Sequence, residues 1–167
     1  PDNFVPVELS PVNTIGANTA LTSLDPKIVL STIRNVEVVG DPSMALSIEC
    51  AQRRRSLQGS KVDTETHLAT SHRALRLQAF PKDSGLRAHF RAFALVSGSR
   101  DSTGLNQFEL SALSTHIEIW LDFLAQSTSQ GYKIKDISVA ISDIRIMDKL
   151  MLSGRVDKGE LIGRTKD

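Results

Sequence analysis

Basic side chains concentrate in the middle of the sequence, where nine lysines and arginines between Arg53 and Arg91 stand against three acidic residues. Guanidinium groups grip phosphate or carboxylate through paired hydrogen bonds, so this stretch favours an anionic ligand. The run Arg53 to Arg55 also has a structural interpretation, because cations stabilise a helix C-terminus and Arg53 can pair with Glu49 one turn earlier.

The next arginines fall on a predicted strand over residues 66–80. Alternation along this strand puts His72, Arg76 and Gln78 on one mainly polar face, and the other face is apolar. We predict that Arg76 forms an anion site together with His72, Gln78 or Arg91, because charge-assisted bonds to phosphate are stronger than neutral ones. A polar face turned to solvent, without a ligand, is the alternative.

The partner strand is predicted over residues 87–97, after a turn made by PKDSG. His89 and Arg91 share one face of it, and Phe90 points to the other. An aromatic residue in this position fills a core or stacks on a base, and both interpretations stay open. The two strands form a predicted basic hairpin over 66–98.

Other reactive residue types carry weaker signals. The four histidines lack the spacing of a metal site, so we predict no protein-bound metal. Cys50 lies in an apolar helical stretch typical of a buried thiol. As the only cysteine it cannot form an intrachain disulfide, which favours a reducing compartment and a cytoplasmic protein.

The elements that must position these residues follow from hydrophobic periodicity and turn signals. The predicted order is a hairpin of 27–33 and 35–39 turning at Arg34–Asn35, a helix 42–57 capped by Asp41, the basic hairpin, a long helix 105–126, a strand 134–141 and a helix 143–152. Hairpins with helices between them predict an α+β fold, an antiparallel sheet flanked by helices, with the helix 105–126 packed on one face.

Length and composition predict one soluble domain. The 167 residues carry a formal net charge of +1, too small for a polybasic protein. No apolar run approaches the roughly 18 residues of a membrane span, so we expect no membrane partner. We predict an N-terminal arm over 1–26, which is rich in proline, a single α+β domain over 27–154 and a polar tail over 155–167.

From 36 to 152 the chain resembles the catalytic core of class II aminoacyl-tRNA synthetases, closest to the histidyl enzyme and the related ATP phosphoribosyltransferase regulatory subunit. EVVGDPSMALSIECAQRRR resembles the family's strand, acidic turn and leucine-x-proline-glutamate segment. It places Glu49 at the acid that faces the amino acid, with Ile48 in place of the family's proline. HRALRLQAF and LRAHFRAFALVSG resemble motif 2. Arg76, with Arg73 second, matches the arginine that binds the α-phosphate, and Phe90 matches the adenine-stacking phenylalanine.

The resemblance implies a class II synthetase-like fold and a nucleotide or aminoacyl-type ligand, with ATP a candidate cofactor. No stretch resembles motif 3, which carries the family's second nucleotide arginine, so we expect a fragment or a degenerate relative that binds without activating. A non-enzymatic module that binds RNA or protein through the basic hairpin is the alternative. The candidate macromolecular partners are RNA and a second copy of the chain, as a homodimer.

We predict that this chain alone does not activate an amino acid. Attack of a carboxylate on the α-phosphate needs positive groups around the developing charge, and only the Arg76 side of such a clamp is present. Pyrophosphate exchange with the purified chain and the full amino-acid set should stay at background. Robust exchange that depends on any one amino acid would contradict this prediction.

Overall fold

The structure is a computed structural model. It describes residues 3–22, 24–57, 65–100, 104, 106–141, 149 and 152–154, and the chain divides into two compact units, Pro1–Phe123 and Leu124–Asp167. Each unit is considered by itself. The domain boundaries expected from the sequence stay predictions.

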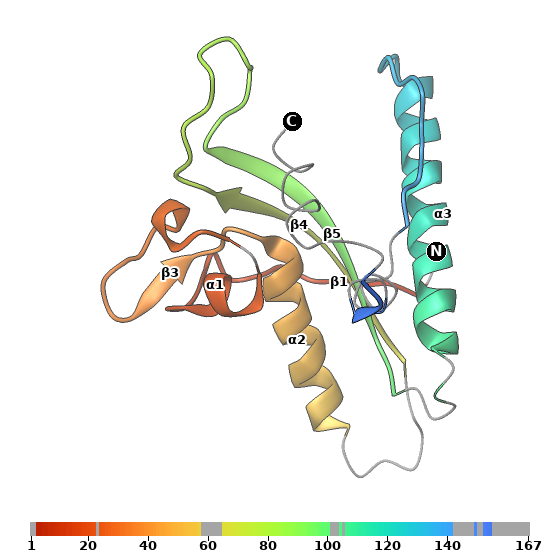
Figure 1. The fold of residues 1–167 in the computed structure, drawn as a ribbon, viewed down its shortest axis with the longest axis horizontal. Coiled ribbons are helices and arrows are strands. Elements are labelled where there is room, and N and C mark those ends of the chain that lie inside the picture. The colour runs from red at the N-terminus through yellow and green to blue at the C-terminus, as the bar shows by residue number, and fades with distance from the viewer. Residues whose placement is uncertain are drawn as a thin grey trace. The chain divides into compact units, whose positions relative to one another are not determined.

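A three-stranded sheet organises the first unit (Figure 1). Strands β4 (Thr66–Leu75) and β5 (His89–Gly98) pair antiparallel over ten residues each, which confirms the predicted hairpin. Strand β1 (Val5–Pro6) pairs parallel to the other edge of β4. The α+β class is therefore confirmed, but the sheet is mixed and not purely antiparallel as expected.

The parallel strand lies in the segment that the sequence analysis assigned to an irregular arm. The Val7 amide donates to the Ala69 carbonyl at 2.8 Å, and the Thr70 hydroxyl donates to the Val7 carbonyl at 2.7 Å. Pro6 is tolerated because an edge strand leaves one side of its backbone unpaired. A pairing of two residues with one side-chain hydrogen bond is too short to produce a hydrophobic periodicity in the sequence.

A second, two-stranded sheet pairs β2 (Val12–Thr14) antiparallel with β3 (Val36–Val38). Arg34 and Asn35 have positive φ angles of 68° and 58°, which confirms the predicted turn. The prediction of a strand over 27–33 is wrong. Pro26–Ile28 forms the short 3-10 helix η1, capped by the Asp25 carboxylate at 2.9 Å from the Lys27 amide, and the returning chain makes one bridge, Ser31 to Glu37.

Helix α2 (Pro42–Ser56) begins as predicted. The Asp41 carboxylate accepts the Ser43 amide at 2.9 Å, and Pro42 occupies the first turn, where its missing N–H is no loss. Leu46 and Cys50 project from this helix into a small core with Leu68 of β4 and Ala94 of β5.

This packing corrects the predicted faces of β4. His72 shares its face with Leu68, Thr70 and Ala74, all of them buried, so the face expected to be polar is the one that packs against α2. The reason is that the apolar and small residues at the start of the strand determine which side α2 covers, and the polar residues cluster only toward its end.

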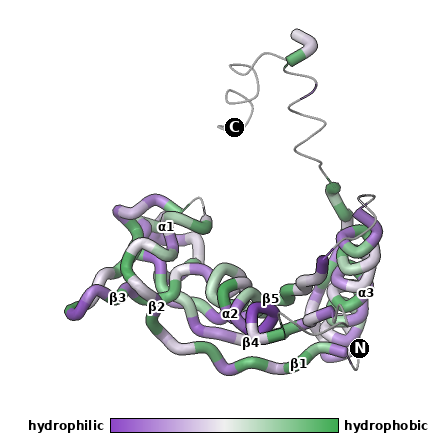
Figure 2. Tube along the Cα trace, turned by 90° about the horizontal axis from the view of Figure 1, so that it is seen from below, coloured by the Kyte–Doolittle hydropathy of each residue, from purple (hydrophilic) through white to green (hydrophobic). Residues whose placement is uncertain are grey.

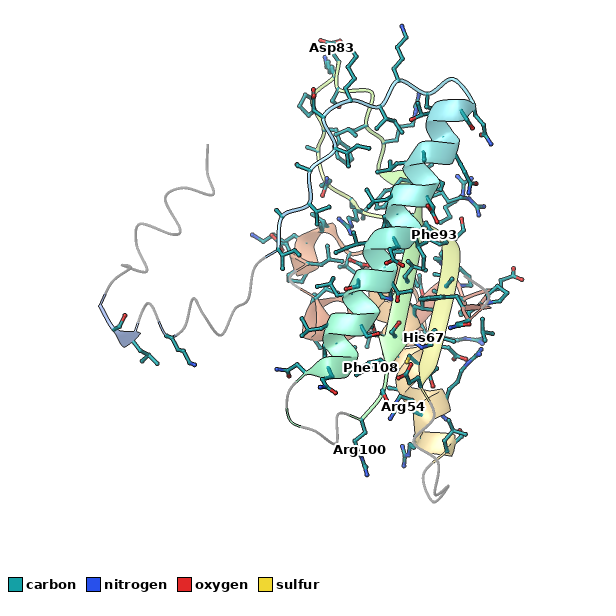
Figure 3. All side chains as sticks on the ribbon, turned by 90° about the vertical axis from the view of Figure 1, so that its right-hand side faces the viewer. Arg54, His67, Asp83, Phe93, Arg100 and Phe108 are labelled. Carbon is teal, nitrogen blue, oxygen red and sulfur yellow. The ribbon has the colours of Figure 1, made fainter. Side chains whose placement is uncertain are left out.

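Helix α3 (Gln107–Ser129) confirms the longest predicted helix. Its residues contact the face of the sheet opposite α2: the Trp120 ring lies 5.5 Å from the Phe93 ring, and His116 Nε2 lies 2.9 Å from Ser97 Oγ. In Figure 3 Phe93 lies beneath the middle of α3, with His67 and Phe108 near its N-terminal end. The predicted packing of this helix on one sheet face is confirmed.

Part of the predicted apolar stripe of α3 is exposed to solvent. Leu110 is 63% exposed, and Leu113 and Leu121 are exposed as well. Hydrophobic and hydrophilic residues are interspersed along the helix (Figure 2). Phe108, His116 and Trp120, which are aromatic or polar, contact the sheet, because β4 offers His67 and β5 offers Phe93 and Ser97 as partners.

In the second unit, the strand expected over 134–141 is absent from the described residues. Ile137, Val139 and Ile141 are exposed and carry no ladder. The helix expected over 143–152 lies almost wholly outside the described residues. Within the described chain, no helix combines the length and apolar character needed to cross a bilayer.

We predict that Gly98→Ala destabilises the fold by about 1–3 kcal/mol through overpacking. A Cβ on Gly98 would lie 2.8 Å from Cys50 Sγ and 3.0 Å from Arg54 Cδ. In a Cys50→Ala background the same substitution should cost less, because its closest neighbour is gone. Urea denaturation of the four proteins measures this coupling, and equal costs in both backgrounds would contradict it.

A second prediction concerns acid sensitivity at α3. Burial lowers the pKa of His116 from its ordinary 6.5, and the nearby charge of His67 lowers this pKa further. The unfolded chain therefore binds more protons just below pH 6.5, and stability is lost as pH falls from there through the lowered pKa.

His116→Gln should make the unfolding free energy less dependent on pH between about 7.5 and 5. The slope should not vanish, because burial and the charge of Arg91 also lower the pKa of His72. His89→Gln, on an exposed side chain, serves as the matched control and should retain the wild-type slope. A wild-type slope in His116→Gln would refute the assignment.

Candidate functional site

Arg76 follows directly after β4 and is held in place on three sides. Its Nε donates to the Gly40 carbonyl at 2.8 Å, and one terminal nitrogen lies 3.4 Å from the Asp41 carboxylate. The guanidinium carbon lies 5.3 Å from the centre of the Phe90 ring, a cation–π distance. The side chain is therefore preorganised, which lowers the entropy lost when a ligand binds.

The backbone that receives Arg76 is fixed by a fully buried amide side chain. Asn18, in α1 (Ala17–Leu21), donates from Nδ2 to the Val38 carbonyl at 2.9 Å and accepts the Gly40 amide at 3.0 Å. Gly40 is closely surrounded, since a Cβ would lie 3.0 Å from Leu24 Cδ1 and 3.3 Å from Asn18 Oδ1.

Glu37 fixes the other end of the same junction. Its buried carboxylate accepts the Gly16 amide at 2.9 Å and the Asn18 amide at 2.6 Å. A buried charge needs such partners, because its desolvation would otherwise be very costly. The short helix α1 is thereby anchored to β3, immediately before the Gly40–Asp41 turn.

A cavity of about 480 Å³ opens beside Arg76. It is basic and aromatic, and none of its lining residues is acidic. The lining residues are Arg76, Gln78, Phe80, Gly85, Leu86, Arg87, His89 and Phe90. The structure therefore brings together Arg76, Gln78 and Phe90 from the predicted site.

The other predicted cations lie elsewhere. Arg73 and Arg91 occupy the sheet face opposite Phe90 and line a second cavity of about 1100 Å³, together with His72. Arg91 Nη1 donates to the carbonyl and hydroxyl oxygens of Ser71 at 3.1 and 3.3 Å. His89 lines both cavities. The predicted set is thus divided between two sites.

Glu49 lines neither of these cavities. Its carboxylate accepts Arg53 Nε at 2.7 Å, which confirms the helix pair expected from their spacing. Arg54 Nη1 donates to the Gly98 carbonyl at 3.0 Å. The start of the arginine run therefore has structural contacts on and around α2.

Sequence reasoning did not select five of the residues beside Arg76, and three of the five have aromatic or basic side chains. Phe80, Arg87 and His89 line the smaller cavity. Alternation from Arg76 through Gln78 was a usable signal for Phe80, whereas Arg87 and His89 arrive from the far side of the loop, which only tertiary structure brings close. No group of metal-binding side chains is found within the described residues.

Comparison with known proteins adds no assignment, because no family model and no curated protein matches this sequence.

Proposed function

We propose that this chain is a class II synthetase-like domain that binds a nucleotide, with ATP the foremost candidate, in the cavity beside Arg76. The observation that carries the proposal is the fixed guanidinium of Arg76, which lies over Phe90 in the wall of an aromatic and basic cavity. Such a site offers a nucleotide both of the groups that it needs, cations for phosphate and rings for a base.

In this proposal Arg76 and Arg87 hold the phosphates. Phe80 and Phe90 are the two aromatic residues on which the base can stack, and base–aromatic stacking contributes about 1–3 kcal/mol per base. Gln78 supplies an amide that can both donate to and accept from a base edge. The absence of acidic residues from this lining favours an anionic ligand.

The resemblance to class II synthetases supports the same assignment. Arg76 and Phe90 match the family's phosphate-binding and stacking residues, and they share one cavity wall here. Glu49 pairs with Arg53 instead of facing this cavity, so the nucleotide, and not an amino acid, is the ligand that we propose. Binding without activation remains our expectation.

A module that binds RNA through the whole basic hairpin is less well supported. Arg73 and Arg91 lie on the sheet face opposite Phe90, so the cations of the hairpin do not form one continuous track. A polyanion gains affinity from many aligned phosphate contacts, whereas a mononucleotide needs only a local cluster.

Isothermal titration of the purified chain with ATP tests the proposal. Arg76→Ala should weaken binding at least tenfold, because about 1.5–3 kcal/mol is typical of a hydrogen bond to a charged group. Arg55→Ala is the matched control, since it removes an exposed arginine of α2 and should leave the affinity unchanged. Arg76→Ala should also lower stability by about 1 kcal/mol through the lost Gly40 bond, so folding is verified at the titration temperature.

Two outcomes would contradict nucleotide binding. One is the absence of measurable ATP binding by the folded wild-type chain. The other is equal ATP affinity in wild type and Arg76→Ala. Tight binding of an oligouridylate that weakens steeply with salt, without ATP binding, would establish the RNA-binding alternative instead.

A further inference from the structure

The outer edge of β4 has a gap in its pairing. At one end β1 pairs with Leu68 and Ala69, and at the other the Leu75 amide donates to the Val39 carbonyl at 3.2 Å. Backbone groups of alternate residues point to the same edge of a strand, so those of Ser71 and Arg73 face the gap between these two contacts. Within the described chain no strand pairs with this stretch of the edge.

The cavity of about 1100 Å³ lies at this gap. Much of its lining is apolar and comes from the segment after β1, from β3 and from the end of β4: Val7, Leu9, Pro11, Val38 and Leu75. Its charged lining residues are Arg73, Arg91 and Glu8, so the site is basic by one charge with its histidines neutral. Apolar walls around a few polar groups are typical of a binding site for an organic ligand.

Two of these charges are arranged unfavourably for the protein alone. Arg73 and Arg91 stand directly opposite each other in the β4–β5 register, a placement that destabilises a sheet when the charges are alike. Neither forms an ion pair with a described residue. A bound anion would offset their repulsion.

His72 contributes no ligand group to this cavity. Its Nε2 makes no hydrogen bond with the described residues, but this atom is fully buried, and the side chain lies on the α2 face of the sheet, whereas Arg73 and Arg91 lie on the opposite face. An anion in the cavity is therefore bound by the two arginines and not by His72.

We propose that this cavity binds the carboxyl terminus of an extended peptide whose last residues are apolar. The peptide backbone pairs with the edge of β4 at the Ser71 amide and at Arg73, as in strand addition. The terminal carboxylate binds Arg73 and Arg91, and the apolar side chains contact the Val7 and Leu75 side of the cavity. A free phosphate would use the cations but neither the strand edge nor the apolar walls.

The test is fluorescence anisotropy with a labelled peptide that ends in three valines and a free carboxylate. On the wild-type chain, amidation of the peptide's carboxyl terminus should weaken binding at least tenfold, a comparison that needs no variant. Arg73→Gln and Arg91→Gln should each weaken binding of the free-acid peptide about tenfold, the loss expected for one charge-assisted contact. Glu8→Gln should strengthen it, because one negative charge leaves the cavity lining.

Arg55→Gln is the control for net charge, since this arginine is exposed on α2 and lines neither cavity. It should bind the peptide as wild type does.

Equal binding of the acid and amide peptides, or affinity insensitive to both cavity arginines, would overturn the proposal. Displacement of the peptide by inorganic phosphate with equal acid and amide affinity would indicate a simple anion site, and binding of oligouridylate without peptide binding would indicate a nucleic-acid site. Both would also overturn it.

Discussion

The geometry of the first unit depends on the two backbone hydrogen bonds of the buried Asn18 carboxamide. It spans the backbone between Val38 and Gly40, so it sets where β3 stops and where α2 starts. The Gly40 carbonyl is then available to Arg76, and the Asp41 carboxylate both caps α2 and pairs with the same arginine. One amide side chain thus couples the N-terminal segment to the cationic end of β4.

Hydrogen bonds fix the connection between β3 and α2 because the apolar core is small. The central core cluster consists of Leu46, Cys50, Leu68 and Ala94, between α2 and the sheet. At the far end of β4, toward Arg76, backbone position is instead set by hydrogen bonds to Asn18 and Glu37. Loss of a single partner there leaves a buried donor or acceptor unsatisfied, which costs about 1–3 kcal/mol.

Local chemistry made several elements predictable. Asp41 followed by Pro42 specifies a helix start, the PKDSG turn separates two alternating strands, and Arg34–Asn35 adopts the positive φ angles that a tight hairpin turn requires. Strands of two or three residues, such as β1 and β2, form because they pair with strands distant in the sequence, so no local pattern predicts them.

In the candidate site too, local features were predictable from the sequence and contacts between distant segments were not. Alternation placed Arg76 and Gln78 together, and the structure agrees. Alternation also separated Phe90 from Arg91 on their own strand, but it could not show that Arg73 shares a face with Arg91, because that depends on the register of two strands across a loop. Nor could it show that Gly40, in another part of the chain, receives the Arg76 guanidinium.

The hydrogen bonds that join α3 to the sheet have a set direction from donor to acceptor. Ser97 Oγ lies 2.8 Å from His67 Nδ1 and 2.9 Å from His116 Nε2, and His67 Nε2 lies 3.1 Å from the Glu65 carboxylate. A hydroxyl has one proton to donate, so with both rings neutral it donates to one imidazole and accepts from the other. The carboxylate favours the tautomer of His67 with its proton on Nε2, which leaves Nδ1 to accept from Ser97 and requires His116 to carry its proton on Nε2. The contact of the Glu65 carboxylate with the sheet histidine therefore selects the tautomer of a histidine on the helix.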